Sequence, residues 1–341
     1  MSHPKLRREF IKIFLIILFT TPIICYSQQK ETNPKEYFKK EISGISDNDA
    51  YTLQVRDGYY TNGIYFKLSC AADPLKSKRF NRPTIKKIVN GFEIGQAMYT
   101  PVDTSKVFPQ DQDRPFAGYL AFTVDKKIFY GNNSILEFGA TLGTIGPNSY
   151  AENIQKWFHG ISGLYINKGW PTQIKNEINL NLKVSYSKPL IKSNYEERFF
   201  NMDGFIKAQV GNAVTNARLG ALIRIGKMEN NWNSTHWKAA ITANTNVGPV
   251  HQVELYFFNE PSITFQVYNS MLQGGMFIKN KGPVVVDIKS LVFTNKIGVM
   301  AAEDPFTTSI IYIFRSKEAK TQIRNENFCS IQIGYRFNKT K

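Results

Sequence analysis

Strict alternation of apolar and polar residues recurs along most of the chain. The clearest segments span residues 64–70, 136–143, 178–186, 237–244 and 331–337. Because successive side chains of a β-strand point to opposite faces of the sheet, a period of two predicts strands with one apolar and one polar face. The pattern therefore predicts an all-β protein.

Two architectures accommodate so many amphipathic strands: a soluble sandwich, and a transmembrane antiparallel barrel with apolar residues outward and polar residues in the lumen. The 25 Phe and 17 Tyr residues, many near segment ends, suit the aromatic girdles of a barrel. The polar faces carry charged and amide side chains in place of a second apolar layer. These features favour a transmembrane barrel of about 12 strands, within a range of roughly 10–14.

The N-terminal residues are typical of a secretory signal peptide. Basic residues between positions 5 and 12 precede an apolar run from Ile13 to Cys25. This run is short for a bilayer-spanning helix, which favours a cleaved signal over residues 1–27 against an N-terminal membrane anchor. No domain boundary or repeat follows, so residues 28–341 are predicted to form a single barrel domain. Within it, residues 28–41 are predicted to be a polar lead-in, and 194–203 and 228–235 are predicted to be loops.

Cysteine content and charge leave alternatives open. Cys70 and Cys329 could form a disulfide, but each lies in an alternating segment where a free cysteine fits equally well. The formal charge of +16 favours polyanionic partners, either nucleic acid or lipid phosphates, and an exported chain meets lipid first. Basic loops that only keep the protein soluble would give the same charge.

One short helix is predicted among the strands, near residues 149–160. Gly146-Pro147 ends the preceding strand, and Ser149 with Glu152 has the spacing of a capping box. Glycines at 160 and 163 are placed to end the helix. The helix would therefore interrupt the barrel pattern in one connection between strands.

The two faces of this predicted helix differ in character. At 100° per residue, Gln155 and His159 lie beside each other and off an apolar stripe. We expect the stripe to pack against the barrel and the pair to face the space between. A histidine beside apolar residues is more often structural than catalytic, so the helix alone does not establish catalysis. The other histidines beyond the predicted signal peptide, His236 and His251, have interfacial or turn surroundings. The stripe consists of Ile154, Trp157, Phe158 and Ile161.

Oxygen-bearing residues gather in two places before the helix. Asp47-Asn48-Asp49 is expected to open the first strand of the mature chain, and Thr61 follows a short loop. Adjacent carboxylate, amide and hydroxyl oxygens suit Ca²⁺, which takes six to eight oxygen ligands. Each cluster is also ordinary turn chemistry, so neither alone predicts a metal site.

Seven spaced motifs occur in order along the chain. They are Asn48-Asp49, Tyr60-Thr61-Asn62-Gly63, Gly95-Gln96 with Tyr99-Thr100-Pro101, Asp113-Arg114-Pro115-Phe116-Ala117-Gly118, Gly143-Thr144-Ile145-Gly146-Pro147, Gln155 with His159, and Gly169-Trp170-Pro171 with Gln173. Taken together, they resemble the lipid A 3′-O-deacylase (LpxR) family of Gram-negative outer membranes. The resemblance covers roughly residues 45–180 by motif and the remainder by barrel pattern.

The resemblance implies a twelve-stranded barrel whose active site lies between its wall and a helix from an extracellular loop. It implies that His159 activates a water molecule and that Gln155 helps to position it. A Ca²⁺ ion near Asp49 would form the oxyanion hole, as in secreted phospholipase A2. The matching motifs also imply catalytic roles for Asn48 and Thr61 and substrate binding by Lys106.

The chemistry of ester hydrolysis agrees with these implied roles, because it needs a base that works near neutral pH and positive charge where the oxyanion develops. Lys106 could bind a lipid A phosphate as a point charge. We therefore expect a monomeric outer-membrane esterase that removes a 3′-acyloxyacyl chain from lipid A of lipopolysaccharide, with no nucleic-acid partner. The alternatives are an outer-membrane phospholipase with a serine nucleophile, for which no Ser-His-Asn set is apparent, and a non-enzymatic barrel.

Overall fold

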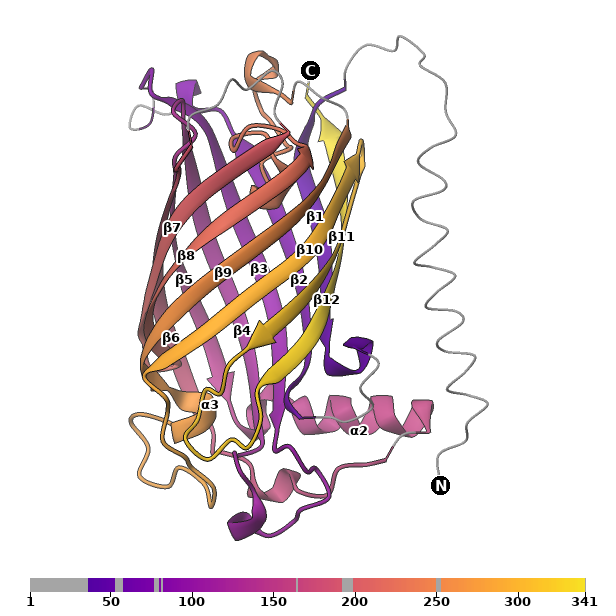
Figure 1. Ribbon diagram of the computed structural model, residues 1–341, viewed down its shortest axis with the longest axis vertical. Coiled ribbons are helices and arrows are strands. Elements are labelled where there is room, and N and C mark those ends of the chain that lie inside the picture. The colour runs from indigo at the N-terminus through magenta and orange to yellow at the C-terminus, as the bar shows by residue number, and fades with distance from the viewer. Residues whose placement is uncertain are drawn as a thin grey trace.

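The computed structural model describes residues 36–52, 58–76, 80, 82–163, 165–191, 199–249 and 253–340. Its strands close into one antiparallel barrel, in which each strand pairs with its chain neighbours and β1 pairs with β12 (Figure 1). The predicted all-β barrel of about 12 strands is confirmed. The strands are β1 (Phe38–Asn48), β2 (Tyr59–Ala72), β3 (Ile85–Thr100), β4 (Ala117–Tyr130), β5 (Ile135–Ile145), β6 (Glu177–Pro189), β7 (Phe200–Gly211), β8 (Val214–Lys227), β9 (Val253–Asn269), β10 (Leu291–Glu303), β11 (Phe306–Arg315) and β12 (Glu326–Lys339).

The helices of the described chain are short and lie in the connections between strands. They are α2 (Ala151–Ser162) and α3 (Ser270–Gln273), with 3₁₀ turns η1 (Asp49–Thr52), η2 (Pro74–Lys76), η3 (Pro109–Asp111), η4 (Pro147–Ser149), η5 (Trp170–Thr172), η6 (Thr235–Trp237) and η7 (Thr245–Val247). Over the residues described, no helix has the length and apolar character needed to cross a bilayer.

The outer surface of the barrel is apolar and its inner surface is polar. In β6, Ile178, Leu180 and Leu182 are 74%, 59% and 56% exposed, whereas the alternating Asn179 and Asn181 are buried. A soluble sandwich would bury those apolar side chains between its sheets. The period of two therefore separates a lipid-facing from a lumen-facing set, as the sequence predicts.

The long connections identify the extracellular end of the barrel. β1 starts and β12 finishes at the same end, and the connections over 101–116, 146–176 and 270–290 lie at the opposite end. Outer-membrane barrels have short periplasmic turns and longer extracellular loops, so the end away from the termini is extracellular. The helix α2, which lies in the second of these connections, is therefore extracellular.

Several predicted boundaries at the N-terminal side need correction. Asp47-Asn48-Asp49 does not open a strand; it ends β1, which begins at Phe38 inside the predicted polar lead-in. The reason is that β1 pairs with β12 from Phe38 onward, a long-range pairing that the local polar composition does not reveal. The predicted signal peptide over 1–27 lies outside the described residues. The predicted loop 194–203 ends early, because β7 starts at Phe200.

The connection between β8 and β9 fills the periplasmic end of the lumen. We call its described part, residues 228–249, the plug. The Thr242 amide donates to the Phe38 carbonyl at 2.7 Å, and the Lys87 ammonium of β3 donates to Asn233 at 2.7 Å and to the Ala239 carbonyl at 2.6 Å. The plug therefore supplies hydrogen-bond partners to inward-facing groups of the barrel.

The plug contains the predicted strand 237–244, and this prediction is wrong. The alternating apolar residues of the segment, Trp237, Ala239 and Ile241, pack inside the barrel with inward-facing side chains such as Phe129 and Phe258. At this end of the barrel the lumen is apolar, so the apolar side chains of an alternating segment can be buried there and not only in lipid. The predicted loop over 228–235 is confirmed up to the start of η6.

Cys70 and Cys329 are too far apart for a disulfide, and His236 lies inside the barrel and not at its interface with the membrane. Cys70 and Cys329 are both free. They lie opposite Lys40 and Asn48 of β1, eight residues and about 26 Å apart along the strand, which excludes a bond between them. His236 lies in η6 and is only partly buried, with its side chain 12% exposed and 3.8 Å from the Glu260 carboxylate of β9. His251 lies outside the described residues.

The plug predicts a specific loss of stability. Trp237→Ala removes a buried aromatic side chain of the plug and should lower the free energy of unfolding by about 3–5 kcal/mol. Urea titrations in detergent, followed by heat-modifiable gel migration, would measure the loss. The matched control is Trp157→Ala, because Trp157 is 66% exposed, and it should shift the midpoint far less. Equal shifts in the two variants would contradict a packed plug.

Candidate active site

The helix α2 lies against the outer side of the wall formed by the extracellular ends of β3 and β4 (Figure 1). The Gln96 side-chain amide of β3 donates to the Ser149 carbonyl at 2.5 Å, just before the helix. In β4, a Cβ on Gly118 would clash with the Ser149 hydroxyl and with Ala151. Glycine is therefore needed where the helix meets the wall.

The helix begins without the predicted capping box, and it ends at one of the two predicted glycines. Ser149 donates to the Gly146 carbonyl at 2.6 Å, and Tyr150, in the left-handed region at φ 58°, precedes the helix. The Glu152 carboxylate accepts from Lys156 at 2.6 Å and from the Gln173 amide at 3.2 Å, so it does not close a box. The predicted span of 149–160 thus moves to Ala151–Ser162, and Gly163 at φ 64° ends the helix.

The orientation predicted for the helix is reversed. Ala151, Gln155 and His159 are buried, at 1%, 4% and 7% exposure, whereas Trp157 and Ile161 of the apolar stripe are 66% and 68% exposed. The stripe does not pack against the barrel; the opposite face does, where Ala151 packs with Met98 of β3, and Gln155 and His159 on that face contact Trp170 and the Tyr165 carbonyl. A sequence pattern indicates that two faces differ, but it does not indicate which environment each face meets.

Two hydrogen bonds orient the buried pair. The Trp170 indole N–H of η5 donates to Gln155 Oε1 at 2.6 Å, and Gln155 Nε2 is buried with no acceptor among the described residues. His159 Nδ1 lies 2.6 Å from the Tyr165 carbonyl oxygen. A carbonyl can only accept, so Nδ1 carries the proton and, in the neutral ring, Nε2 carries the lone pair. This tautomer leaves Nε2 able to take a proton from a bound molecule.

Asn48 and Asp49 lie where β1 passes into the turn η1. Asp49 is buried, and its Oδ2 accepts the Gly58 amide at 2.8 Å while its carbonyl accepts the Thr52 hydroxyl at 2.8 Å. Asn48 Oδ1 accepts the Ala50 amide at 2.7 Å. The end of a strand and a tight turn thus hold a buried carboxylate at the extracellular rim.

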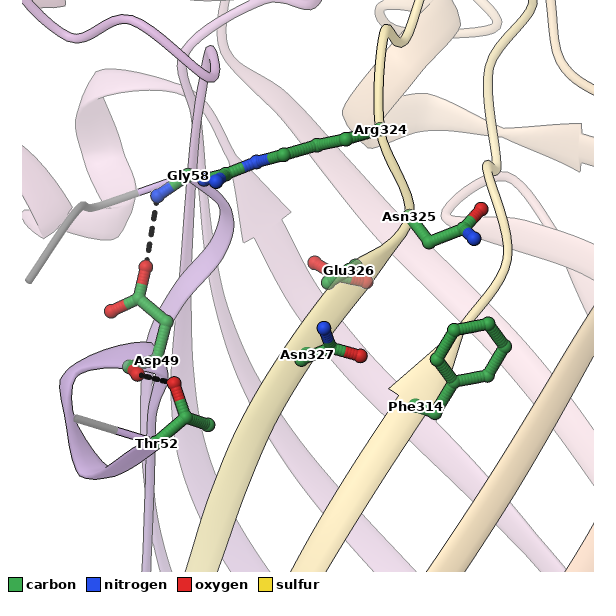
Figure 2. A pocket seen from close by; sticks show the side chains of 8 residues that line it. All are labelled: Asp49, Thr52, Gly58, Phe314, Arg324, Asn325, Glu326 and Asn327. Carbon is green, nitrogen blue, oxygen red and sulfur yellow. Dashed lines mark hydrogen bonds between the residues drawn. The ribbon is translucent and has the colours of Figure 1, made fainter. Parts of the chain in front are cut away.

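A cavity of about 230 Å³ adjoins Asp49. Figure 2 shows Asp49 and Thr52 of η1 on one side and the start of β12 on the other, with the Arg324 side chain crossing beside Gly58. The guanidinium occupies the space that a Cβ on Gly58 would need, 2.6 Å away. The lining consists of Asp49, Thr52, Gly58, Phe314, Arg324, Asn325, Glu326 and Asn327.

The oxygen-rich part of this lining fits a hard cation. Asp49, Thr52 and Asn327 offer carboxylate, hydroxyl and amide oxygens, which are ligands that Ca²⁺ uses. No group of three or more His, Cys, Asp or Glu side chains in the described chain is arranged to hold a metal. The other carboxylate of the lining, Glu326, is paired with Arg315 at 3.0 Å, so a Ca²⁺ ion here would depend on Asp49 together with neutral oxygens and water.

Thr61 lies at an irregularity of the β2–β3 pairing. Tyr60 is opposite Tyr99 and Asn62 is opposite Met98, so Thr61 is the extra residue of a β-bulge. Its hydroxyl hydrogen-bonds to that of Thr100 at 2.8 Å, and both residues are buried. The bulge redirects the strand next to Asn48 and Asp49.

Lys106 lies apart from these residues, in the connection between β3 and β4. Its side chain is exposed, and its carbonyl accepts the Gln112 amide at 3.2 Å. Gly169, after α2, approaches the same carbonyl closely, since a Cβ there would be 2.9 Å away. The backbone of the Lys106 loop is therefore tied to the segment after the helix, while its ammonium stays in reach of solvent.

The strand register shows that the end of β1, with Asn48 and Asp49, and the helix α2 lie on the same sector of the wall. Asn48 of β1 is opposite Asn62 of β2, and Asn62 is opposite Met98 of β3. Met98 packs with Ala151 of α2, together with Phe116 and Trp170. Asn48 and Met98 are thus two strand spacings, about 10 Å, apart. Strands β1–β3 hold Asn48, Asp49 and Thr61, and α2 holds Gln155 and His159 against the same sector.

Some residues of this region were not assigned roles by sequence reasoning. Trp170 and Gln96 lie within motifs that the sequence indicates, so their involvement could have been inferred. Arg324 and Glu326 lie about 165 residues beyond α2 in sequence, and only barrel closure brings them next to Asp49. No local pattern marks them.

A family model described as "Outer membrane protein LpxR" matches residues 13–337 of the 341. The chain belongs to the LpxR family. It is therefore a protein of the bacterial outer membrane, and the family resemblance of its motifs is confirmed. No match is found among curated protein sequences.

Among solved structures, the LpxR-family barrel is similar to LpxR from Salmonella typhimurium, with a TM-score of 0.70 and 19% identity. The match covers 87% of this chain and 100% of that one, which shows a shared fold. The β domain of the Bordetella autotransporter BrkA gives a TM-score of 0.47 at 10% identity, covering 88% and 98% of the two chains. The NalP translocator domain from Neisseria meningitidis gives 0.42 at 8%, covering 90% of each.

Docking of α2 in this LpxR-family protein should depend on Gly118. Gly118→Ala places a methyl group against Ser149 and Ala151 and should push the helix off the wall. We expect faster proteolysis between residues 149 and 175 in detergent, measured by mass spectrometry of the fragments. Gly160→Ala is the matched control, because a Cβ there meets nothing within 4 Å and favours the helix by about 1 kcal/mol. Unchanged cleavage in Gly118→Ala would contradict this contact.

Proposed function

We propose that this LpxR-family protein is an esterase that hydrolyses the ester-linked 3′-acyloxyacyl chain of lipid A. The observation that carries the proposal is His159, held on the buried face of α2 with Nδ1 bonded to the Tyr165 carbonyl. A histidine oriented through one ring nitrogen presents the other as a base. The outer-membrane location places such a base where lipid A is found.

The side chains support direct attack by water. His159 Nε2 would take a proton from a water molecule, and the unpaired Gln155 Nε2 would donate a hydrogen bond to that water's oxygen. The hydroxide attacks the ester carbonyl carbon and the acyl C–O bond breaks. The proton then passes from the imidazolium to the departing alkoxide oxygen, which frees a fatty acid and a sugar hydroxyl. No covalent acyl-enzyme is needed.

A Ca²⁺ ion would be held by Asp49, with Thr52 and Asn327 as neighbouring oxygen donors. When bound, it would supply positive charge to the oxyanion of the tetrahedral intermediate. Asn48 positions η1 by accepting the Ala50 amide, and Thr61 supports the adjacent bulge. Both residues would therefore act by holding Asp49 in place.

Lys106 would bind the phosphate of the lipid A headgroup. Its ammonium is exposed on an extracellular loop whose backbone is tied to the segment after α2. A flexible ammonium acts on phosphate as a point charge and needs no fixed geometry. We propose that the protein acts as a monomer, because both Asp49 and His159 are carried by one chain on one sector of wall.

Replacing the base should abolish turnover. His159→Asn keeps a polar side chain but removes the basic nitrogen, so hydrolysis should fall by roughly 100-fold or more. Gln155→Ala should cost less, because it removes a positioning group. Mass spectrometry of lipid A incubated with each purified variant would follow loss of the acyloxyacyl mass. Heat-modifiable migration checks folding, and a folded His159→Asn protein with wild-type activity would refute the proposed base.

Removing the metal should have a similar effect. Excess chelator should stop hydrolysis and added Ca²⁺ should restore it, since oxyanion stabilisation is worth several kcal/mol of barrier, on the order of 10²–10³ in rate. Asp49→Ala should behave like the chelated enzyme and need far more Ca²⁺ for rescue. The same lipid A assay measures both. Full activity in chelator would point instead to a hydrolase without metal, such as a serine phospholipase.

A further inference from the structure

The helix α2 has three distinct faces. One face, the wall face, consists of the buried residues Ala151, Gln155 and His159. A second face, the polar face, carries Glu152, Asn153 and Lys156. The third, which we call the apolar face, is exposed and consists of Tyr150, Ile154, Trp157, Phe158 and Ile161.

The angular arrangement of these faces is specific. At 100° per residue, the centres of the apolar and polar faces lie roughly 110° to either side of the centre of the wall face. In Figure 1, α2 starts beside the barrel, lies crosswise to the long axis of the molecule and extends past the barrel outline, so its apolar and polar faces point in different directions away from the wall face. A helix that only packed on the wall in water would expose polar side chains on both sides.

Contacts of the polar face show which way it points. Glu152 accepts a hydrogen bond from Gln173 at 3.2 Å. The segment around Gln173 belongs to the packed extracellular connections, because the Lys175 amide donates to the Lys281 carbonyl at 3.2 Å and Thr172 donates to Gln112 at 2.9 Å. The polar face is therefore turned toward the extracellular loops. The apolar face is turned away from them.

The surface on that other side is the lipid-facing band of the barrel. Gln96 of β3 contacts the start of α2, and Ile94, the next residue on the same outer face, is 52% exposed. Two residues of strand span about 7 Å, so the apolar band begins one step below the helix. Phe92 of β3 and Phe122 of β4 continue it along the wall. The apolar face is thus continuous with a surface that lipid covers.

We propose that α2 is an interfacial helix whose apolar face is inserted into the acyl layer of the outer leaflet. A short helix with one aromatic and aliphatic face and one charged face has the character of such helices. Trp157 and Tyr150 suit the boundary between acyl chains and headgroups. Insertion places the buried pair Gln155 and His159 at this boundary, and it does not depend on whether the pair catalyses hydrolysis.

Spin labels in phosphatidylcholine vesicles test the insertion. A single cysteine at 157 or at 161, in a C25S, C70S and C329S background, carries a nitroxide. The collisions of this nitroxide with oxygen and with a water-soluble nickel chelate are measured. References are label positions 66, on the lipid-facing wall, and 156, on the polar face. We expect 157 and 161 to resemble 66, with loss of nickel accessibility. Nickel accessibility at 157 and 161 equal to that at 156 would overturn the proposal.

The labels also separate lipid from a second copy of the chain as the occupant. Dipolar broadening at 157 that disappears when labelled protein is diluted with unlabelled protein would mean that two copies cover the apolar face, and it would overturn insertion. Absence of broadening together with oxygen accessibility supports it. Heat-modifiable migration verifies that each labelled variant is folded.

An independent measurement needs no cysteine. Trp170 and Trp237 are buried, and Trp232 belongs to the plug inside the barrel, so Trp157 is the tryptophan placed to meet lipid. Fluorescence of the unmodified protein should be quenched by acyl-brominated phosphatidylcholine, and Trp157→Phe should lose most of that quenching. Lys156→Gln, the matched control next to it, should keep it. Quenching that is unchanged in Trp157→Phe would contradict insertion of this helix.

Discussion

Pairing of β1 with β12 is the constraint on which the other features of this protein depend. In the hydrocarbon core no water can satisfy backbone amides and carbonyls, so a sheet that crosses it must have no open edge. The register of closure runs from Phe38 opposite Lys339 to Asn48 opposite Cys329. It ends β1 at the extracellular rim, and this is why the turn that carries Asp49 lies there. The same closure brings Glu326 and Arg324 to the opposite side of the cavity.

Closure also encloses charged side chains, which must find their ion-pair and hydrogen-bond partners inside the barrel. The inward face carries charges, and a buried charge without a partner is strongly unfavourable. Lys67 pairs with Asp125 at 2.6 Å across the strands, and Lys87 bonds to the plug, which also brings apolar residues to the lumen. Arg114 is fully buried and lies over the Tyr99 ring at 4.7 Å. The plug thus packs the barrel at its periplasmic end, and the residues of the candidate site lie on the outside of its wall.

The position of α2 depends on two small residues where it meets the strand and on the side chains that the wall presents there. Glycine at 118 and alanine at 151 let the backbone of the helix region meet the strand, and Trp170 covers the remaining side of Gln155. The wall at this height is mixed, since Gln96 donates to the Ser149 carbonyl and Met98 packs with Ala151. The wall face of the helix, which carries both small and polar side chains, meets this mixed part of the strand. The apolar residues of the helix lie on the side where lipid is available.

The sequence by itself determined the barrel, because alternation is a local property that each strand carries whatever it pairs with. It also indicated the helix between β5 and β6 and the residues Asn48, Asp49, Thr61, Gln155 and His159 as candidates, through motifs that are contiguous or nearly so. Only the tertiary structure decided which face of α2 meets the wall, since amphipathicity distinguishes two faces without naming their environments. It alone placed residues 237–244 in the plug, because side chains that face an apolar lumen and side chains that face lipid follow the same alternating pattern. It alone placed β12 beside Asp49, because that contact arises from closure between segments nearly 280 residues apart in sequence.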